Sequence, residues 1–334
     1  MQQRMFTEPG PVLDAAGRPV AGYSTRPVLR YDRSAIRASA FRIKEWDFYQ
    51  ISNRNLCLQF TYGHASYAGE VGIMFFDFRT GKWIERFDHM LALPFGRLHM
   101  PPDADADQTL AFDKGGVYME YSVKAGVRTL RCKKDDFETE IVLRRENPEA
   151  VLINIPFAEK PTQFYYNHKI NCMRAEGWAK KAGETYTFSP AESFGLLDWG
   201  RGVWPFHNEW YWSNGTGLVN GQVFGFNLGC GFGDTGAATE NMLFYEGKAH
   251  KLGRVRITHE ADWMAPWLLT DEEERIALTL TPTYDRTTRT KLLFIDNECH
   301  QVFGRFDGFA VLDDGRKLDI SELYAFAEHA VNNW

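Results

Sequence analysis

Tryptophans and charged side chains crowd into one short segment near the middle of the sequence. Four of the ten tryptophans of the 334-residue chain lie within 14 residues, and Asp198 and Arg201 stand among them. A carboxyl group buried between apolar rings has a raised pKa and can donate a proton near neutral pH, whereas a neighbouring guanidinium keeps it ionised. The segment indicates acid-assisted chemistry or, as the simpler alternative, a tryptophan-rich core strand with a structural ion pair. Its residues are Asp198, Trp199, Arg201, Trp204, His207, Asn208, Glu209, Trp210 and Trp212.

A second signal is the glycine-rich stretch that contains Gly229, Gly231 and Gly233. A dinucleotide fingerprint needs its third glycine three positions after the second and a helix behind it, and neither condition is met here. Glycine at every second position instead bares one face of a strand, which makes room for a large neighbour or a ligand. Glu240 and Asn241 follow just beyond and are candidates for the rim of that space, although an exposed acidic turn is the plainer interpretation of Glu240.

A third candidate is a strand that alternates aromatic and polar side chains. Tyr166 and His168 share one of its faces with Ile170, because successive residues of a strand point to opposite sides. An inward polar face would suit a polar cavity, but the pattern favours an ordinary solvent-facing strand. The opposite face carries Asn167, Lys169 and Asn171.

These residues form one predicted site. We expect Glu240 to be the proton donor and Asp198, paired with Arg201, to stabilise a developing positive charge. The predicted ligand-binding residues are Trp199, Arg201, Trp204, Trp210, Trp212, Asn227, Tyr166, His168 and Asn241.

The rest of the chain supplies the elements that must position this site. Short runs of β-branched and aromatic residues alternate with polar ones between turn signals, which predicts antiparallel sheet. Ala125-Gly126 and the charged tetrad Lys133 to Asp136 fit hairpin turns between consecutive strands. The predicted strands are Val117 to Val123, Val127 to Lys133, Phe137 to Leu143, Val151 to Pro156 and Arg275 to Thr283.

The predicted fold is all-β and mainly antiparallel, with two lipocalin-like barrel halves. A soft boundary near Glu159 to Thr162 divides the chain into residues 1–160 and 161–334, each large enough for a barrel of eight to ten strands. The Trp- and Gly-rich site falls in the second half. A C-terminal helix is expected as well: Asp319 or Ser321 can cap it, and the apolar residues that follow recur at helical spacing. Those residues are Leu323, Phe326, Ala327 and Ala330.

Composition excludes several classes of protein. Aromatic residues make up 15% of the chain and the net charge is −6, with no long basic run, so a nucleic-acid partner is not expected. The N-terminal segment lacks an apolar stretch of signal-peptide length, which predicts a cytoplasmic protein without a transmembrane segment. The five cysteines and nine histidines are dispersed, so neither a metal site nor a cofactor is predicted.

Several stretches in order carry a resemblance to a known family: Tyr166 to Cys172, Leu197 to Pro205, Trp210 to Trp212, Phe226 to Gly229, and Thr239 to Asn241. Together they resemble the bacterial domain of unknown function 2804 over nearly the whole chain. More remotely, the sequence is similar to carotenoid-hydratase-like tandem-lipocalin proteins, whose two β-barrels enclose apolar ligands and in some branches catalyse hydration or cyclisation. The likeness implies a fold and no catalytic residues, since no motif of those enzymes matches here.

Three functions stay open at this point. The first is a cofactor-independent lyase or isomerase that binds an apolar or amphipathic small molecule in an aromatic-lined cavity and assists its hydration, isomerisation or cyclisation. The second is a non-catalytic lipid or isoprenoid carrier that uses the same residues. The third is a carbohydrate-active protein, because aromatic platforms and paired carboxylates also suit sugars.

Overall fold

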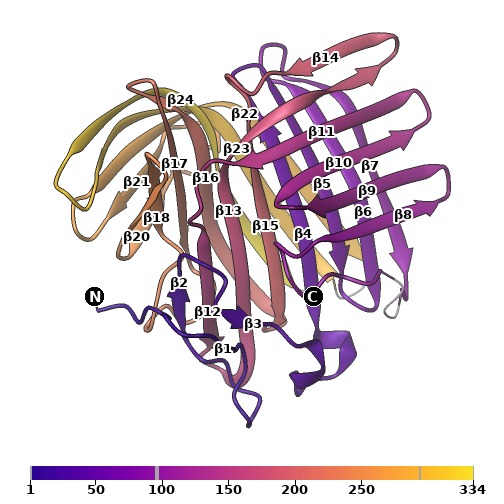
Figure 1. Cartoon of the computed structure of the whole chain (residues 1–334). Helices are drawn as coiled ribbons and strands as arrows, with labels where there is room; N and C mark the ends of the chain where they lie inside the picture. Colours follow the sequence, from indigo (N-terminus) through magenta and orange to yellow (C-terminus); the bar gives the residue numbers. More distant parts are fainter. Residues whose placement is uncertain (1, 95–97, 293–294, 334) are drawn as a thin grey trace.

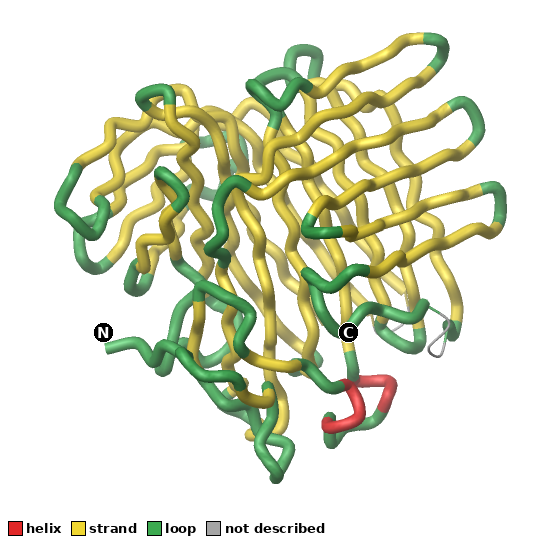
Figure 2. The backbone as a smooth tube through the Cα atoms, viewed as in Figure 1, coloured by secondary structure: helices red, strands yellow, loops and turns green. Residues whose placement is uncertain are grey.

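The computed structural model describes residues 2–94, 98–292 and 295–333, and its regular structure is nearly all β. Figure 2 shows strands throughout, with helix confined to one short region. That region holds two single 3₁₀ turns, η1 (Arg33–Ala35) and η2 (Ala40–Arg42). The predicted all-β, antiparallel fold class is confirmed.

Within the described ranges, the first sheet has thirteen strands and contains the N-terminal part of the chain. Its main path runs β7-β6-β5-β4-β15-β13-β11-β10-β9-β8, and a two-stranded pair of β1 (Gly10–Pro11) and β3 (Leu29–Arg30) lies apart from it. The strands of the first sheet are β2 (Gly22–Ser24), β4 (Lys44–Ser52), β5 (Leu56–His64), β6 (Ala68–Asp77), β7 (Lys82–Ala92), β8 (Gln108–Lys114), β9 (Val117–Lys124), β10 (Val127–Lys134), β11 (Phe137–Arg145), β12 (Val151–Phe157), β13 (Lys160–Lys181), β14 (Glu184–Phe188) and β15 (Phe194–Val203).

The second sheet has nine strands in the part of the chain that the structure describes, in the order β19-β18-β17-β16-β24-β23-β22-β21-β20. Its strands are β16 (His207–Val219), β17 (Gln222–Cys230), β18 (Met242–Tyr245), β19 (Lys248–Lys251), β20 (Val255–Thr258), β21 (Trp267–Asp271), β22 (Ile276–Leu292), β23 (Ile295–Val311) and β24 (Lys317–Asn333).

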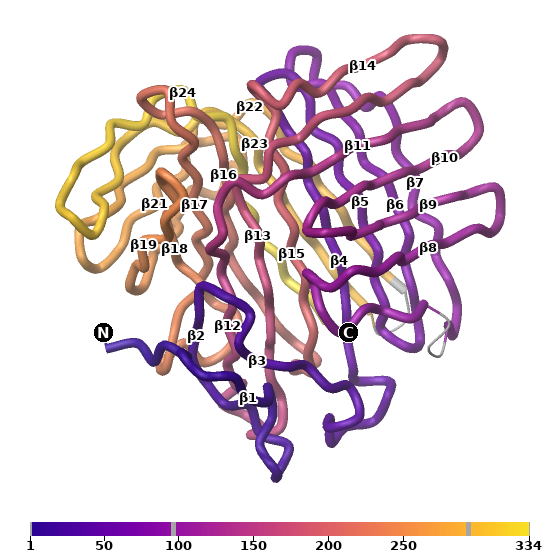
Figure 3. Tube along the Cα trace, in the orientation of Figure 1, coloured from indigo at the N-terminus to yellow at the C-terminus, as the bar shows by residue number. Residues whose placement is uncertain are grey.

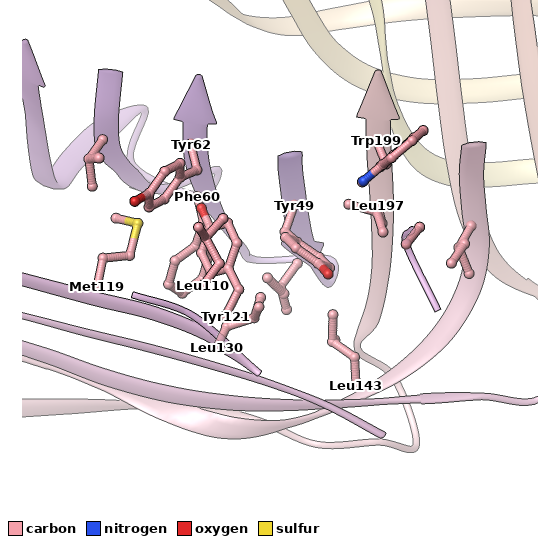
Figure 4. Packing of buried hydrophobic residues seen from close by; sticks show 14 of the residues in the cluster. Tyr49, Phe60, Tyr62, Leu110, Met119, Tyr121, Leu130, Leu143, Leu197 and Trp199 are labelled. Atoms are coloured by element: carbon pink, nitrogen blue, oxygen red, sulfur yellow. The ribbon is translucent and has the colours of Figure 1, made fainter. Parts of the chain in front are cut away.

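The first sheet curls until its two ends face each other, and we call it the first half-barrel. In Figure 1, strands β8 to β11 cross in front of β4 to β7. The ring of Tyr121 on β9 lies 5.1 Å from Tyr49 on β4 and 6.1 Å from Phe60 on β5. Alternate residues of each strand point into this shared interior, where they bury apolar area. Figure 4 shows part of that packing: Tyr49, Phe60 and Tyr62 lie on one wall, and Leu110, Met119 and Tyr121 on the other.

The second sheet curls in the same way into a second half-barrel, whose interior is packed with Phe226, Trp267 and Leu278 among other apolar side chains. The two half-barrels then pack against each other through their outer faces, as the trace in Figure 3 shows for β13 and β15 beside β16 and β17. Phe76 and Phe303 meet across this contact with ring centroids 5.1 Å apart. The chain therefore buries both faces of its central strands.

The predicted C-terminal helix is wrong. Residues Lys317–Asn333 form strand β24, which pairs with β16 on one side and β23 on the other. Leu323 and Ala327 face the core of the second half-barrel, whereas Phe326 faces the contact between the half-barrels. A strand buried on both faces loses its alternation of apolar and polar residues, and its apolar run then imitates the spacing of a helix.

The predicted hairpins are confirmed. Ala125 and Gly126 form the turn between β9 and β10, with φ values of 50° and 77°, and Asp135 begins the next turn with a φ of 52°. The division at residue 160 stays a prediction; the change from the first sheet to the second comes between Val203 and His207. Among the described residues, no helix is long and apolar enough to cross a membrane.

Candidate functional site

Strands β13 and β15 separate two buried regions, the contact between the half-barrels and the interior of the first one. They pair antiparallel, with Lys169 opposite Asp198 and His168 opposite Trp199. Because neighbouring residues point to opposite faces, Lys169 and Asp198 lie at the contact between the half-barrels, whereas His168 and Trp199 lie inside the first one.

At the contact, Lys169 is the centre of a buried polar group. Its Nζ lies 3.5 Å from Asp198 Oδ2 and 3.2 Å from Glu240 Oε2. The same ammonium sits 4.0 Å from the centroid of the Trp212 ring, which is a close cation–π contact. The two predicted catalytic carboxylates therefore share one cation, although the first comes from β15 and the second from the loop between β17 and β18.

Two asparagines tie these charges into a network. Asn167 on β13 donates from Nδ2 to Asp198 Oδ1 at 2.5 Å. Asn227 on β17 accepts from Trp212 Nε1 at 2.8 Å and donates to the Glu240 backbone oxygen at 2.9 Å. We call Asn167, Lys169, Asp198, Trp212, Asn227 and Glu240 the Lys169 cluster.

Gly229 leaves open the space that the side chain of Glu240 occupies. A Cβ on Gly229 would lie 2.1 Å from Glu240 Oε1, so no larger residue leaves room for that carboxylate. The backbone N–H of Gly229 donates to Asn241 Oδ1 at 2.6 Å, which fixes the loop behind it. The predicted close approach is confirmed at Gly229, where Glu240 uses the space. The prediction of one strand face bared by three glycines is wrong, because β17 ends at Cys230, and Gly231 and Gly233 lie beyond it with φ values of 91° and 76°.

The charges of the cluster support one another. Burial opposes the charged form of Lys169, but Asp198 and Glu240 outweigh burial and raise the pKa of Lys169 above its ordinary value. Lys169 is therefore a buried ammonium at the contact between two sheets.

A third acid lies in the same layer. Glu328 on β24 accepts from Trp210 Nε1 at 2.8 Å and from Gln301 Nε2 at 3.1 Å. Burial raises the pKa of Glu328 against the opposing effects of Arg286, Trp210 and Lys169. The layer thus contains an ammonium, two carboxylates paired with it, and a third carboxyl group whose pKa is raised by burial.

A small hollow lies next to the cluster, between β4 and β15 on one side and β16 and β24 on the other. Its volume is about 10 Å³, and Gln50, Asn214 and Thr216 are among its lining residues. Asn214 also donates to Asn227 Oδ1 at 3.1 Å, which connects the hollow to the cluster.

The predicted ion pair between Asp198 and Arg201 is wrong. The two residues are three positions apart on one strand, so their side chains point to opposite faces. Arg201 donates instead to Asp47 Oδ1 at 2.8 Å and to the backbone oxygens of Trp46 at 2.7 Å and Pro101 at 2.8 Å. It belongs to the interior of the first half-barrel.

Other predicted ligand-binding residues also lie away from the cluster. Trp199 packs edge-on against Tyr166 with centroids 5.7 Å apart, inside the first half-barrel, and His168 is buried near them. Trp204 lies at the end of the contact between the half-barrels, where its ring centroid is 5.8 Å from that of Phe232. The structure therefore brings Asp198, Glu240, Trp212 and Asn227 together and separates Tyr166, His168, Trp199, Arg201 and Trp204 from them. Asn241 supports the loop of Glu240, and Trp210 binds Glu328.

Sequence reasoning missed Lys169, Asn167 and Glu328. The polar face of β13 was visible as an alternation, but it matched a solvent-facing strand equally well. Glu328 was hidden inside the expected helix. In the part of the chain that the structure describes, no three His, Cys, Asp or Glu side chains are grouped so that they could hold a metal ion.

Comparisons with known proteins agree with this architecture. The family model described as "Domain of unknown function (DUF2804)" matches residues 3–334. No curated protein matches the sequence significantly.

Solved structures share the fold at low sequence identity. Kievitone hydratase from Nectria haematococca is 9% identical, covers 86% of this chain and 88% of its own, and gives a TM-score of 0.52. CghA, solved with Sch210972, is 9% identical, covers 96% of each chain and gives a TM-score of 0.55. A Nitrosomonas europaea protein provisionally named AttH is 12% identical, covers 90% of this chain and 96% of its own, and gives a TM-score of 0.54. The expected likeness to tandem-lipocalin proteins is confirmed at the level of fold.

Proposed function

Since the chain belongs to the DUF2804 family, for which no activity is implied, we propose a function from its site: acid-assisted chemistry on an apolar or amphipathic small molecule bound between the two half-barrels. The reaction class is addition or loss of water, isomerisation or cyclisation without a cofactor. The observation that carries the proposal is the Lys169 ammonium between Asp198 and Glu240, with Glu328, whose pKa burial raises, in the same buried layer.

Each charged group has a role in this proposal. Glu328 is the proton donor in this proposal, because burial raises its pKa and a raised pKa brings a carboxyl closer to the range that suits general acid catalysis. Asp198 and Glu240 stabilise positive charge that develops on the substrate, together with the face of the Trp212 ring. Lys169 positions both carboxylates. The role of acid thus moves from Glu240 to Glu328.

The fold supports a small-molecule function without identifying the substrate. One structural neighbour is named a hydratase and another was solved with a bound compound. At these identities the likeness concerns the fold alone, so the substrate has to be found by experiment. A ligand larger than water would require the sheets to part near Asn214, where the small hollow lies.

The first experiment is native mass spectrometry of gently purified protein, followed by extraction and identification of any released compound. That compound is then incubated with the protein in D₂O and in H₂¹⁸O, and label incorporation is measured. We expect wild-type protein to incorporate label and Glu328→Gln to lose on the order of 10²-fold or more of the rate. Asp198→Asn and Glu240→Gln should also lose rate.

The matched control is Glu246→Gln, which neutralises an exposed acid of the second half-barrel that pairs with Arg316. It should incorporate label at the wild-type rate. Folded Glu328→Gln protein that also reacts at that rate would overturn the assignment. A stoichiometric ligand that never exchanges label in the wild type would instead establish a carrier.

A further inference from the structure

The interior of the first half-barrel contains buried donors that lack an acceptor. Among the described residues, five such atoms lie on the inward faces of its strands. Three of the side chains that carry them, Tyr121, Arg128 and Arg201, come from facing walls and are at most 4% exposed. All five atoms can donate a hydrogen bond, that of His168 depending on its tautomer. The atoms without a hydrogen bond are Tyr121 OH, Arg128 Nε, His168 Nε2, Trp199 Nε1 and Arg201 Nε, the last of which lies 3.8 Å from Glu45 Oε1 in an ion pair.

One irregular segment supplies part of the acceptors that the two arginines have, beside Asp47 and Trp46 for Arg201 and Gly126 for Arg128. We call residues Pro101 to Asp107 the latch; they precede β8. Arg201 Nη2 donates to the Pro101 oxygen at 2.8 Å, and Arg128 Nη2 donates to the Ala104 oxygen at 2.9 Å. The latch therefore connects β15 on one wall to β10 on the other.

Asp105 is the carboxylate of the latch that reaches the arginines of the interior. Its carboxylate pairs with Arg128 and lies 3.1 Å from Arg145 Nη1, while His168 Nε2 is 3.9 Å away. If the buried guanidinium of Arg128 had no charged partner, it would strongly destabilise the folded protein. Asp105 thus occupies an anion site that is built by two arginines and one histidine.

The latch is held by polar bonds more than by apolar packing. Pro101 and Ala104 are buried, whereas Pro102, Asp103 and Ala106 are exposed. An acceptor-rich molecule could replace these bonds one for one, since a carboxylate offers Arg128 and Arg145 the same geometry as Asp105 does.

We propose that the first half-barrel is a second binding site, which takes an amphipathic carboxylate with further oxygen acceptors when the latch swings away. The ligand carboxylate replaces Asp105 between Arg128 and Arg145. Its other oxygens satisfy the unpartnered donors, and its apolar part covers the place of Pro101 and Ala104. This site is distinct from the Lys169 cluster, because His168 and Lys169 point to opposite faces of β13.

The proposal is tested with the fluorescent carboxylate 11-(dansylamino)undecanoate and its methyl ester, titrated against the intact chain. Asp105→Asn should bind the carboxylate at least about 10-fold more tightly than wild type, because the internal carboxylate that competes for the arginines is gone. Arg145→Met should weaken binding by about 10-fold. The methyl ester should not gain affinity in Asp105→Asn.

Two controls separate this site from general effects. Asp113→Asn removes an exposed carboxylate of β8 and should bind like wild type. Glu328→Gln should also bind like wild type, so that failure of this proposal and failure of the proposed reaction are distinguishable.

Hydrogen exchange of the wild-type latch gives a second measurement that requires no variant to fold. Probe carboxylate should speed amide exchange in residues 101–107, because binding displaces them. Equal affinity in wild type, Asp105→Asn and Arg145→Met would overturn the proposal, as would slower exchange of the latch on binding.

Discussion

The two half-barrels have similar curled sheets but different interiors. The second is filled by side chains such as Phe226, Trp267 and Leu278, which gain stability simply by leaving water. The first encloses Arg128 and Arg201 in addition to its apolar residues. Apolar side chains of similar volume are often as stabilising as a buried ion pair, or more so. The difference teaches that the first interior carries charge for a reason other than stability, and its buried donors without a hydrogen bond are why we propose ligand recognition there.

The largest expected effect comes from Arg201→Met, which tests whether the charged interior depends on this residue. The change removes the donors to Asp47, to Trp46 and to Pro101 and leaves a buried carboxylate unpaired. We expect a loss of about 4 kcal/mol in the free energy of unfolding, measured by urea denaturation. Arg289→Met, which changes an exposed arginine on β22, should cost less than about 1 kcal/mol. Equal losses would contradict the account of Arg201.

Leu278→Ala probes the apolar interior of the second half-barrel. Leu278 is fully buried, so its truncation removes transfer free energy and leaves a cavity. We expect a loss of about 3 kcal/mol that is the same at low and high salt, because no charge is involved. Leu268→Ala, at a site that is 48% exposed, should change stability by less than about 1 kcal/mol. A strong salt dependence for Leu278→Ala would show that the two interiors are less different than we infer.

His168 should make the stability of the first half-barrel depend on pH. Burial lowers the pKa of His168 to about 4, with Arg145 and Arg128 adding to the effect and Asp105 and Asp103 opposing it. Its folded pKa lies below the unfolded value, so the unfolded state binds more protons and stability is lost as the pH falls below about 6.5. We expect wild type to lose roughly 2 kcal/mol between pH 6.5 and pH 5 from this residue.

His168→Leu should remove that part of the pH dependence, measured by urea denaturation across the same range. The control is His207→Leu, since His207 is exposed on β16 and should leave the slope unchanged. If His168→Leu kept the full wild-type slope, another group would be responsible for the acid sensitivity.

The sequence predicted the fold wherever apolar residues on one face of a strand alternate with polar residues on the other face. Strands β9, β10 and β11 have this pattern and were found with their turns. It failed at β24, because a strand between two cores presents apolar residues on both faces. The same limit explains why some site residues were assigned incorrectly. Alternation shows that His168 and Lys169 point to opposite faces of the strand, but it does not show that both faces are buried.

The candidate site was predicted in part for a related reason. Asp198 and Glu240 were identified from their aromatic and glycine-rich surroundings, and both reach Lys169 in the structure. The local pairing of Asp198 with Arg201 failed because residues three apart on a strand diverge. Contacts that join β15 to the loop before β18 depend on how two sheets dock, and no local pattern in the sequence encodes that docking.

The smallest expected effect is that of Trp210→Phe, which sharpens the comparison by probing the contact between the half-barrels. The change removes the indole donor to Glu328 and should cost about 1 kcal/mol, measured by urea denaturation. The bond from Trp210 lowers the pKa of Glu328, so its loss raises that pKa further. A carboxyl whose folded pKa is raised contributes stability below its unfolded pKa and loses it as the pH rises through the folded value. The cost of Trp210→Phe should therefore grow as the pH rises through the folded pKa of Glu328, which lies above the ordinary value of a glutamate.

In a Glu328→Gln background the cost of Trp210→Phe should no longer vary with pH, because the titrating group is absent. A cost that still grew with pH in that background would place the titration on another group and remove the argument for Glu328 as the acid. If the pH dependence disappears instead, Glu328 is the titrating group at the contact between the half-barrels, and it titrates separately from the histidine inside the first half-barrel. That separation is what two independent sites on the two faces of β13 require.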